Sequence, residues 1–136
     1  MRGSISGRFT FESSFQMMNP KWSYEKNLAV FGKTNVDEPC LHTYQLMVTV
    51  SGELDLETGF VVDLKLLRSL INKEVIQKMN HKNLNKDMNE FKGYVPTCEI
   101  IAYVICTMIR SKIHPRHEIK ITIQEDENTI ATYGEA

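Results

Sequence analysis

Cysteine and histidine side chains can bind metals, act as nucleophiles or transfer protons near neutral pH, and this chain has three cysteines and four histidines. The cysteines, Cys40, Cys98 and Cys106, are widely spaced and include no Cys-x-x-Cys pair of the kind that binds zinc or carries out redox chemistry. Their odd number also argues against a disulfide framework. The cysteines therefore predict a protein of a reducing compartment, and we expect it in the cytoplasm.

Carboxylates that could act as bases or hold a ligand gather in two segments that we expect to be loops. Asp37 and Glu38 stand directly before Pro39, and Glu125 opens the turn sequence Glu-Asp-Glu-Asn. By composition alone, such acids are typical of a solvent-exposed surface. Their chemistry therefore depends on what the fold places beside them.

Length and charge restrict the partners of this chain. Its 136 residues are 42% hydrophobic and are expected to form one domain over residues 1–136. With 16 basic and 17 acidic side chains, and no basic block with interleaved aromatics, nucleic acid is not an expected partner. No apolar run approaches the roughly 18 residues of a membrane span, and no signal-peptide stretch follows Met1. We expect a small molecule or another protein chain as the partner.

Hydrophobic periodicity predicts the elements that position these residues. Four segments alternate apolar and polar side chains as half-buried strands do: 8–15, 42–50, 119–124 and 129–133. Two segments have apolar residues at helical spacing, 64–78 after the N-cap Asp63 and 98–108 after the N-cap Thr97. Residues 17–40 lack periodicity and are predicted as a long connection, and residues 80–94 as an irregular polar segment.

The order strand, strand, helix, helix, strand, strand predicts an α+β fold. We expect a four-stranded antiparallel sheet with both helices on one face. Such a sheet leaves two edges exposed, and sheets commonly manage exposed edges by pairing them with a neighbour. The sequence therefore predicts oligomerisation.

Six short motifs, in this order and spacing, resemble the 6-pyruvoyl-tetrahydropterin synthase and 6-carboxy-tetrahydropterin synthase family, which has the tunnelling fold. The motifs are Phe31-Gly32-Lys33, His42-Thr43-Tyr44, the segment 50–64, His81-Lys82-Asn83-Leu84-Asn85, Pro96-Thr97-Cys98-Glu99 and Gln124-Glu125-Asp126-Glu127-Asn128. The resemblance implies that three chains pair their sheets into a twelve-stranded barrel and that two trimers stack into a hexamer. It also implies a site shared between subunits, where a glutamate holds a pterin beside a zinc ion.

The resemblance assigns the pterin-holding role to Glu125. A carboxylate at this position can accept two parallel N–H bonds from the guanidine-like edge of a pterin. Thr97, Cys98 and Glu99 occupy the family's Thr-Thr-Glu position at the start of a helix, where backbone donors can bind a ring oxygen. We therefore expect these four residues to bind the ligand.

The same resemblance places the three zinc ligands of the family at Phe15, Cys40 and His42, where only the last is still a histidine. Catalytic zinc normally has three protein ligands and one open position, and Phe15 has no donor atom. We therefore expect no zinc and no other cofactor. The alternative is a residual metal site formed by Cys40 and His42.

The proton-transfer group of the family is also altered. Its cysteine and its Asp-His pair correspond here to Thr34, Asn80 and His81. A hydroxyl does not act as a base near pH 7 without strong activation, so His81 is left as the titrating member. Asp37 or Glu38 could replace the missing thiol.

These residues predict a divergent family member that binds a pterin or purine-like ligand through Glu125, without zinc and without the phosphate-eliminating lyase reaction. One alternative is an active synthase acting on dihydroneopterin triphosphate, with Glu38 or Asp37 as base and His81 as acid. Another is a non-catalytic assembly or regulatory subunit. In each case we expect a homo-oligomer, either a trimer or a dimer of trimers.

Overall fold

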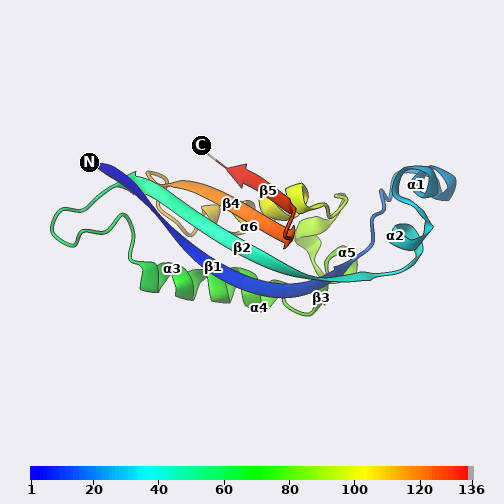
Figure 1. The fold of residues 1–136 in the computed structure, drawn as a ribbon, viewed down its shortest axis with the longest axis horizontal. Helices are drawn as coiled ribbons and strands as arrows, with labels where there is room; N and C mark the ends of the chain where they lie inside the picture. Colours follow the sequence, from blue (N-terminus) through cyan, green and yellow to red (C-terminus); the bar gives the residue numbers. More distant parts are fainter. Residues whose placement is uncertain (135–136) are drawn as a thin grey trace.

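Two long strands form the backbone of the fold in the computed structural model, which describes residues 1–134 (Figure 1). Strand β1 (Arg2–Phe15) pairs antiparallel with β2 (Cys40–Glu53) along its whole length, from the Arg2–Glu53 pair to the Phe15–Cys40 pair. Alternate side chains of both strands are buried, which confirms the period-2 prediction. Both strands are longer than predicted because small residues continue the ladder where the alternation of apolar side chains stops.

The other strands complete a mixed sheet in the order β3-β1-β2-β4-β5. Strands β4 (Glu118–Asp126) and β5 (Thr129–Gly134) form the predicted closing hairpin, with a register irregularity between Gln124 and Asp126. The α+β class is confirmed, but the sheet has five strands and not four. The additional strand β3 (Lys82–Asn83) runs parallel to β1, and its two residues are too few to produce a sequence pattern.

Two predicted helices are present with their predicted N-caps. Helix α3 (Leu64–Ile71) continues through a π-helical segment (Asn72–Ile76) into α4 (Gln77–Met79), and the Asp63 carboxylate accepts a bond from the Lys65 N–H at 2.9 Å. Helix α6 (Cys98–Arg110) begins at Thr97, whose hydroxyl accepts a bond from the Ile100 N–H at 3.2 Å. No helix within residues 1–134 is long and apolar enough to cross a membrane.

The segment 17–40 is not an irregular connection, as its lack of periodicity predicted. It contains α1 (Tyr24–Phe31) and α2 (Lys33–Asp37), which lie at the far end of the β1–β2 ribbon in Figure 1. Helices of this length show too few turns for a periodic signal. A buried amide, Asn27, holds the segment together by accepting from the Asn19 N–H and donating to the carbonyls of Asn19 and Ser23. The segment 80–94 likewise contains α5 (Leu84–Asp87) and a 3₁₀ turn (Asn89–Phe91).

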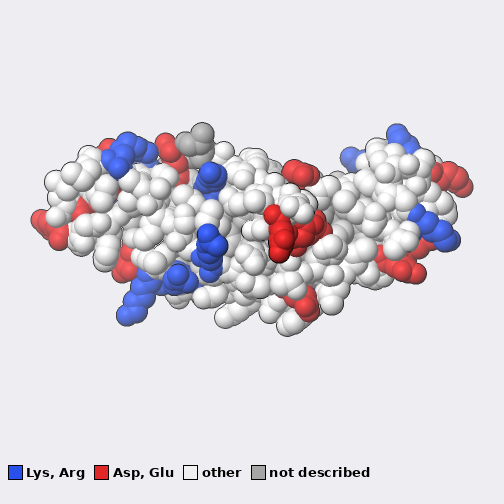
Figure 2. Space-filling view, viewed as in Figure 1, with Lys and Arg blue, Asp and Glu red and all other residues white. Residues whose placement is uncertain are grey.

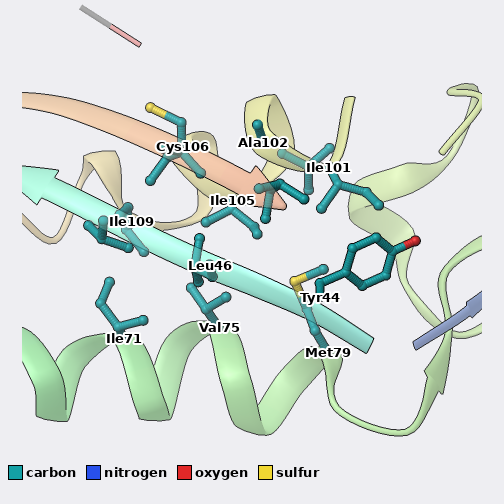
Figure 3. Close-up of a cluster of buried hydrophobic side chains, with 14 of the residues drawn as sticks. Tyr44, Leu46, Ile71, Val75, Met79, Ile101, Ala102, Ile105, Cys106 and Ile109 are labelled. Carbon is teal, nitrogen blue, oxygen red and sulfur yellow. The ribbon is translucent and has the colours of Figure 1, made fainter. Parts of the chain in front are cut away.

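The core lies between the helices and one face of the sheet. We call the continuous helix Leu64–Met79 the α3–α4 rod. Figure 3 shows side chains of β2 between those of α6 and those of this rod. The Tyr44 hydroxyl is directed away from the aliphatic cluster. The opposite face carries the alternate, mainly polar side chains of the strands, and we call it the open face. Its members on the three longest strands include Arg8, Thr10, Glu12, Thr43, Gln45, Lys120, Thr122 and Gln124.

A buried histidine outside the predicted site makes stability depend on pH. His117 is 6% exposed, its Nδ1 has no hydrogen-bond partner within the described residues, and burial lowers its pKa. The unfolded chain therefore binds a proton at a higher pH than the folded chain, so stability decreases as pH falls through the ordinary histidine pKa of 6.5. One proton changes the free energy of unfolding by at most about 1.4 kcal/mol per pH unit.

We expect His117→Leu to reduce this pH dependence in urea unfolding measured from pH 8 to pH 5. The exposed neighbour His114 provides the matched variant, His114→Leu, which should retain most of the parent slope, because burial and not the charge of His114 is the largest cause of the lowered His117 pKa. An unchanged slope in His117→Leu would contradict the assignment.

Candidate ligand-binding site

Two of the predicted ligand-binding residues, Glu125 and Cys98, meet His42, one of the positions that correspond to zinc ligands, at the end of β4. The Glu125 Oε1 atom lies 2.8 Å from Nδ1 of His42 on β2, and its Oε2 atom lies 3.4 Å from Sγ of Cys98 on α6. The register irregularity of β4 occurs at this residue. The sheet and the helix start therefore hold one carboxylate by both of its oxygens.

Aromatic rings surround the imidazole of this cluster. The His42 ring lies 5.3 Å from the Phe15 ring and 6.1 Å from the Tyr44 ring, measured between centroids. Burial raises the Tyr44 pKa far above its ordinary value, and the nearby Cys98 and Glu125 raise it further. The phenol is therefore neutral at physiological pH.

The thiol of Cys98 acts here as a hydrogen-bond donor. Burial, followed by the charge of Glu125, raises the Cys98 pKa to about 12. A thiol with such a pKa is not a nucleophile near neutral pH. Its geometry indicates that it orients the Glu125 carboxylate.

Glu125 also lines an open cavity of about 280 Å³, together with Thr43, Gln45, Gln124, Asp126 and Glu127. Acidic side chains gather at the centre of the face shown in Figure 2, over the β4–β5 turn. The Glu125 side chain is 22% exposed, so a ligand can reach it. A carboxylate has about four acceptor sites, and N–H donors of a ligand can add to those that His42 and Cys98 leave open.

The other two predicted residues at the start of α6, Thr97 and Glu99, stabilise the helix start. Thr97 caps the helix, and Glu99 is exposed in the first turn, where an acid favours the helix dipole. Their side chains do not reach Glu125 in the described hydrogen bonds. Cys98 is the member of this motif whose side chain takes part in the cluster.

The three positions that correspond to metal ligands lie together at the end of the β1–β2 ribbon. Phe15 is paired with Cys40 in the strand register, and its ring contacts His42. Cys40 is half-buried, with Sγ 3.8 Å from Asn35 Oδ1. Within residues 1–134, no group of three or more histidine, cysteine or acidic side chains is arranged to hold a metal ion. The donor set of one thiol and one imidazole does not fit a three-ligand zinc site.

His81 and Asn80 lie beside the edge of β1, and the His81 ring is on the other side of the sheet from His42. Both contact Glu12, whose neighbours Phe11 and Ser13 are buried, so that its own side chain lies on the open face. The His81 Nδ1 atom is 3.6 Å from Glu12 Oε1, and the Asn80 Oδ1 atom accepts from the Glu12 N–H at 2.9 Å. Sequence reasoning missed Glu12. The available signal was that Glu12 is the one acidic side chain of β1.

The three candidates on the Met17–Cys40 segment do not join either cluster. Thr34 is exposed on α2, and Asp37 accepts bonds from the Tyr24 hydroxyl at 2.8 Å and from Lys33 at 3.2 Å. The Tyr24 hydroxyl, followed by Lys33, lowers the Asp37 pKa, which makes this carboxylate a weaker base. Glu38 is exposed, and its carbonyl lies 3.9 Å from Sγ of Cys40. Of the two acids, Asp37 is the one whose carboxylate is bound by neighbouring side chains.

Comparison with known proteins places this chain in one family. The model of the family described as 6-pyruvoyl tetrahydropterin synthase matches residues 4–136. The human 6-pyruvoyl tetrahydrobiopterin synthase is 32% identical over 132 residues, which are 97% of this chain and 91% of that protein. The Drosophila melanogaster protein of the same name is 32% identical over 95% of this chain and 77% of its own length.

A solved structure agrees with these sequence matches. The structure of the Caenorhabditis elegans 6-pyruvoyl tetrahydropterin synthase superposes with a TM-score of 0.91 and 28% identity, covering 100% of this chain and 97% of that chain. The match includes the α+β architecture. This chain therefore belongs to the 6-pyruvoyl tetrahydropterin synthase family.

Proposed function

We propose that this chain, as one domain over residues 1–136, binds a pterin or a purine-like heterocycle through Glu125 and does not catalyse the phosphate-eliminating lyase reaction. The observation that carries the proposal is the Glu125 carboxylate, held by His42 and Cys98 at the edge of an open cavity. A fixed carboxylate is suited to the paired N–H donors of a 2-amino-4-oxopyrimidine. The family relatives are named for their pterin products, which supports a pterin as the ligand.

The second half of the proposal concerns the lost lyase chemistry. Phe15 provides no ligand atom, Thr34 provides no thiol, and residues 1–134 contain no group of three donors that could hold a zinc ion to polarise the substrate. Removing a metal that stabilises the transition state by several kcal/mol lowers the rate on the order of a thousandfold or more. We therefore propose that zinc binding has been lost together with the synthase reaction.

Ligand binding can be tested by thermal shift and isothermal titration calorimetry with neopterin, biopterin and guanine, which share the amino-oxopyrimidine edge. We expect the parent protein to be stabilised by at least one of them by several degrees at saturation. Glu125→Gln should weaken that binding at least tenfold, because an amide presents a donor where the ligand also presents donors. Adenine, which lacks this edge, should not bind.

The matched control is Glu127→Gln, which removes the same charge from the same exposed turn. It should retain the parent affinity. An equal loss in both variants would mean that general acidity of the turn, and not Glu125, attracts the ligand. No stabilisation of the parent by any of the three compounds would remove the binding proposal.

A second assay separates binding from catalysis. Incubation with dihydroneopterin triphosphate and magnesium should release phosphate no faster than the substrate does alone. Release that depends on Glu38 and His81 would instead support an active synthase. Glu38 is the favoured acid because the Asp37 carboxylate is bound by Tyr24 and Lys33. Partner capture that survives Glu125→Ala and His81→Ala together would support an assembly or regulatory subunit.

Family members are generally oligomeric, and the sheet of this chain is not closed on itself. The exposed side chains Ile130 and Tyr133 lie on the edge strand β5, which supports pairing between copies. We propose a trimer or a dimer of trimers. The thiols of Cys40 and Cys98 support a reducing compartment, and we propose the cytoplasm.

A further inference from the structure

Glu12 on β1 lies beside His81, and Asn80, the residue before His81, carries an amide and not a carboxylate. By the resemblance described above, Asn80 corresponds to an aspartate of the family, and the residues on either side of His81, Asn80 and Lys82, are not acidic. In the fold, Glu12 Oε1 lies 3.6 Å from His81 Nδ1. This distance is that of an ion pair and is longer than a hydrogen bond, and catalytic pairs often tighten into a hydrogen bond only when a ligand binds. The partner comes from a strand 69 residues earlier, as the Gln16–Asn85 contact in the same region also does.

Backbone and side-chain hydrogen bonds hold Glu12 and His81 in place relative to each other. The His81 N–H donates to the Glu12 carbonyl at 2.6 Å, and the Asn80 Oδ1 atom accepts from the Glu12 N–H at 2.9 Å. One residue further along β1, the buried Ser13 hydroxyl donates to the Met79 carbonyl at 2.7 Å. Both backbone polar groups of Glu12 are therefore bound by residues 80 and 81.

The conformation of His81 gives independent support. Its φ of 62° is the only positive value of a non-glycine residue within the described part of the chain. Left-handed backbone in a residue with a side chain is uncommon and persists where the surrounding structure imposes it, which occurs often at functional sites. The strained residue here is the one that faces Glu12.

We propose that Glu12 is the acidic partner of His81 and that Asn80 is a clamp for Glu12 rather than a degraded catalytic residue. Glu12 is thus a positioning residue that acts through the imidazole. It accepts the Nδ1–H of His81 and thereby fixes the tautomer in which Nε2 carries the free lone pair. This nitrogen then faces away from Glu12 and is available to a ligand.

The pair provides reversible proton transfer with no metal and no change of oxidation state. A ligand hydroxyl loses its proton to Nε2, so that one O–H bond breaks and one N–H bond forms. The resulting imidazolium is stabilised by the Glu12 carboxylate, and the proton returns to the ligand by the same path. The cavity beside Glu125 reaches the open face at Thr43, which is the register partner of Glu12. The matching ligand class is a heterocycle with a hydroxylated side chain, and this part of the inference rests on the proposed function.

The imidazole tautomer can be measured without any ligand, by long-range ¹H–¹⁵N correlation spectra at pH 8. In the parent protein we expect His81 in the Nδ1–H form. In Glu12→Ala we expect a shift to the Nε2–H form, which free histidine prefers. The signals are assigned by their loss in His81→Asn, and far-UV circular dichroism verifies the fold.

Two references make the measurement specific. His114 accepts a bond from the Arg116 N–H at its Nδ1 atom, at 3.1 Å, and should be in the Nε2–H form in every variant. The matched variant Thr10→Ala removes another exposed side chain from the open face of β1 and should leave the His81 tautomer unchanged. If Glu12→Ala does not fold, Glu12→Thr retains a residue that favours strands and removes the same carboxylate.

An Nε2–H form of His81 in the parent, or an unchanged tautomer in a folded Glu12 variant, would overturn the proposal. A tautomer that changes as expected in a protein that binds no pterin would retain the Glu12–His81 pair and remove only the proposed ligand. The failure of this inference and the failure of the proposed function are therefore distinguishable.

Discussion

Replacing Phe15 and Cys40 with histidine is expected to create a zinc site with His42. Phe15 and Cys40 are paired in the β1–β2 register, and the Phe15 ring already lies 5.3 Å from the His42 ring, so three imidazoles would converge. Zinc at a thousandfold excess over its dissociation constant adds about 4.1 kcal/mol to the free energy of unfolding. The melting temperature of Phe15→His/Cys40→His should therefore rise on the order of 10 °C when zinc is added.

The parent protein should behave differently. Elemental analysis after purification without chelator should find well under one zinc per chain, and added zinc should not stabilise it. Each variant is compared with itself with and without zinc, since Phe15 is 6% exposed and its replacement alone weakens the core. His42→Ala in the double variant should abolish the zinc effect. Stoichiometric zinc in the parent would contradict the loss of the metal site and would require a third ligand for Cys40 and His42.

Phe11→Ala is expected to be the most destabilising single substitution in the ribbon. Phe11 is 1% exposed and stacks on Tyr44 with ring centroids 5.2 Å apart. Truncation of a buried phenylalanine removes apolar contacts and leaves a cavity, at a cost of about 3–5 kcal/mol. For a chain of this size, the melting temperature should fall on the order of 10 °C or more.

Urea unfolding measures this cost directly, and Thr10→Ala is the matched variant. Thr10 is the preceding residue of the same strand, but its side chain lies on the open face and is exposed. Its replacement should change the free energy of unfolding by no more than about 0.5 kcal/mol. Equal effects of the two substitutions would mean that the two faces of β1 are not distinguished as the structure has them, for example because the open face is covered by another copy.

Elements with a long regular period could be predicted from the sequence alone. The alternation along 8–15 and 42–50 predicted β1 and β2, and the helical spacing after Asp63 and Thr97 predicted α3 and α6 with their first residues. A half-buried strand and an amphipathic helix place their apolar residues at fixed intervals, so the pattern is local. Strand β3 and helices α1 and α2 were missed because a strand of two residues and helices of about two turns or fewer do not establish a period.

The candidate site was predictable to the extent that it depends on motif positions. The meeting of Glu125, His42 and Cys98 joins three predicted residues, although their hydrogen bonds could not be derived from spacing. Glu12 could not be found in this way, since its relation to His81 depends on the path of the chain through the α3–α4 rod and back to β1. A contact between residues distant in sequence has no local signal.

The π-helical segment Asn72–Ile76 determines how far the residues after it are rotated about the helix axis, and therefore where His81 lies relative to Glu12. The buried residues Ile71, Val75 and Met79 are four positions apart, and a regular α-helix would carry such a series progressively around its axis. The wider π turn offsets that drift and keeps all three on the core side. Deleting one residue of this segment would rotate the following residues by about 100° about the helix axis and shift them by ~1.5 Å along it. The length of the π turn therefore determines whether His81 contacts the Glu12 carboxylate.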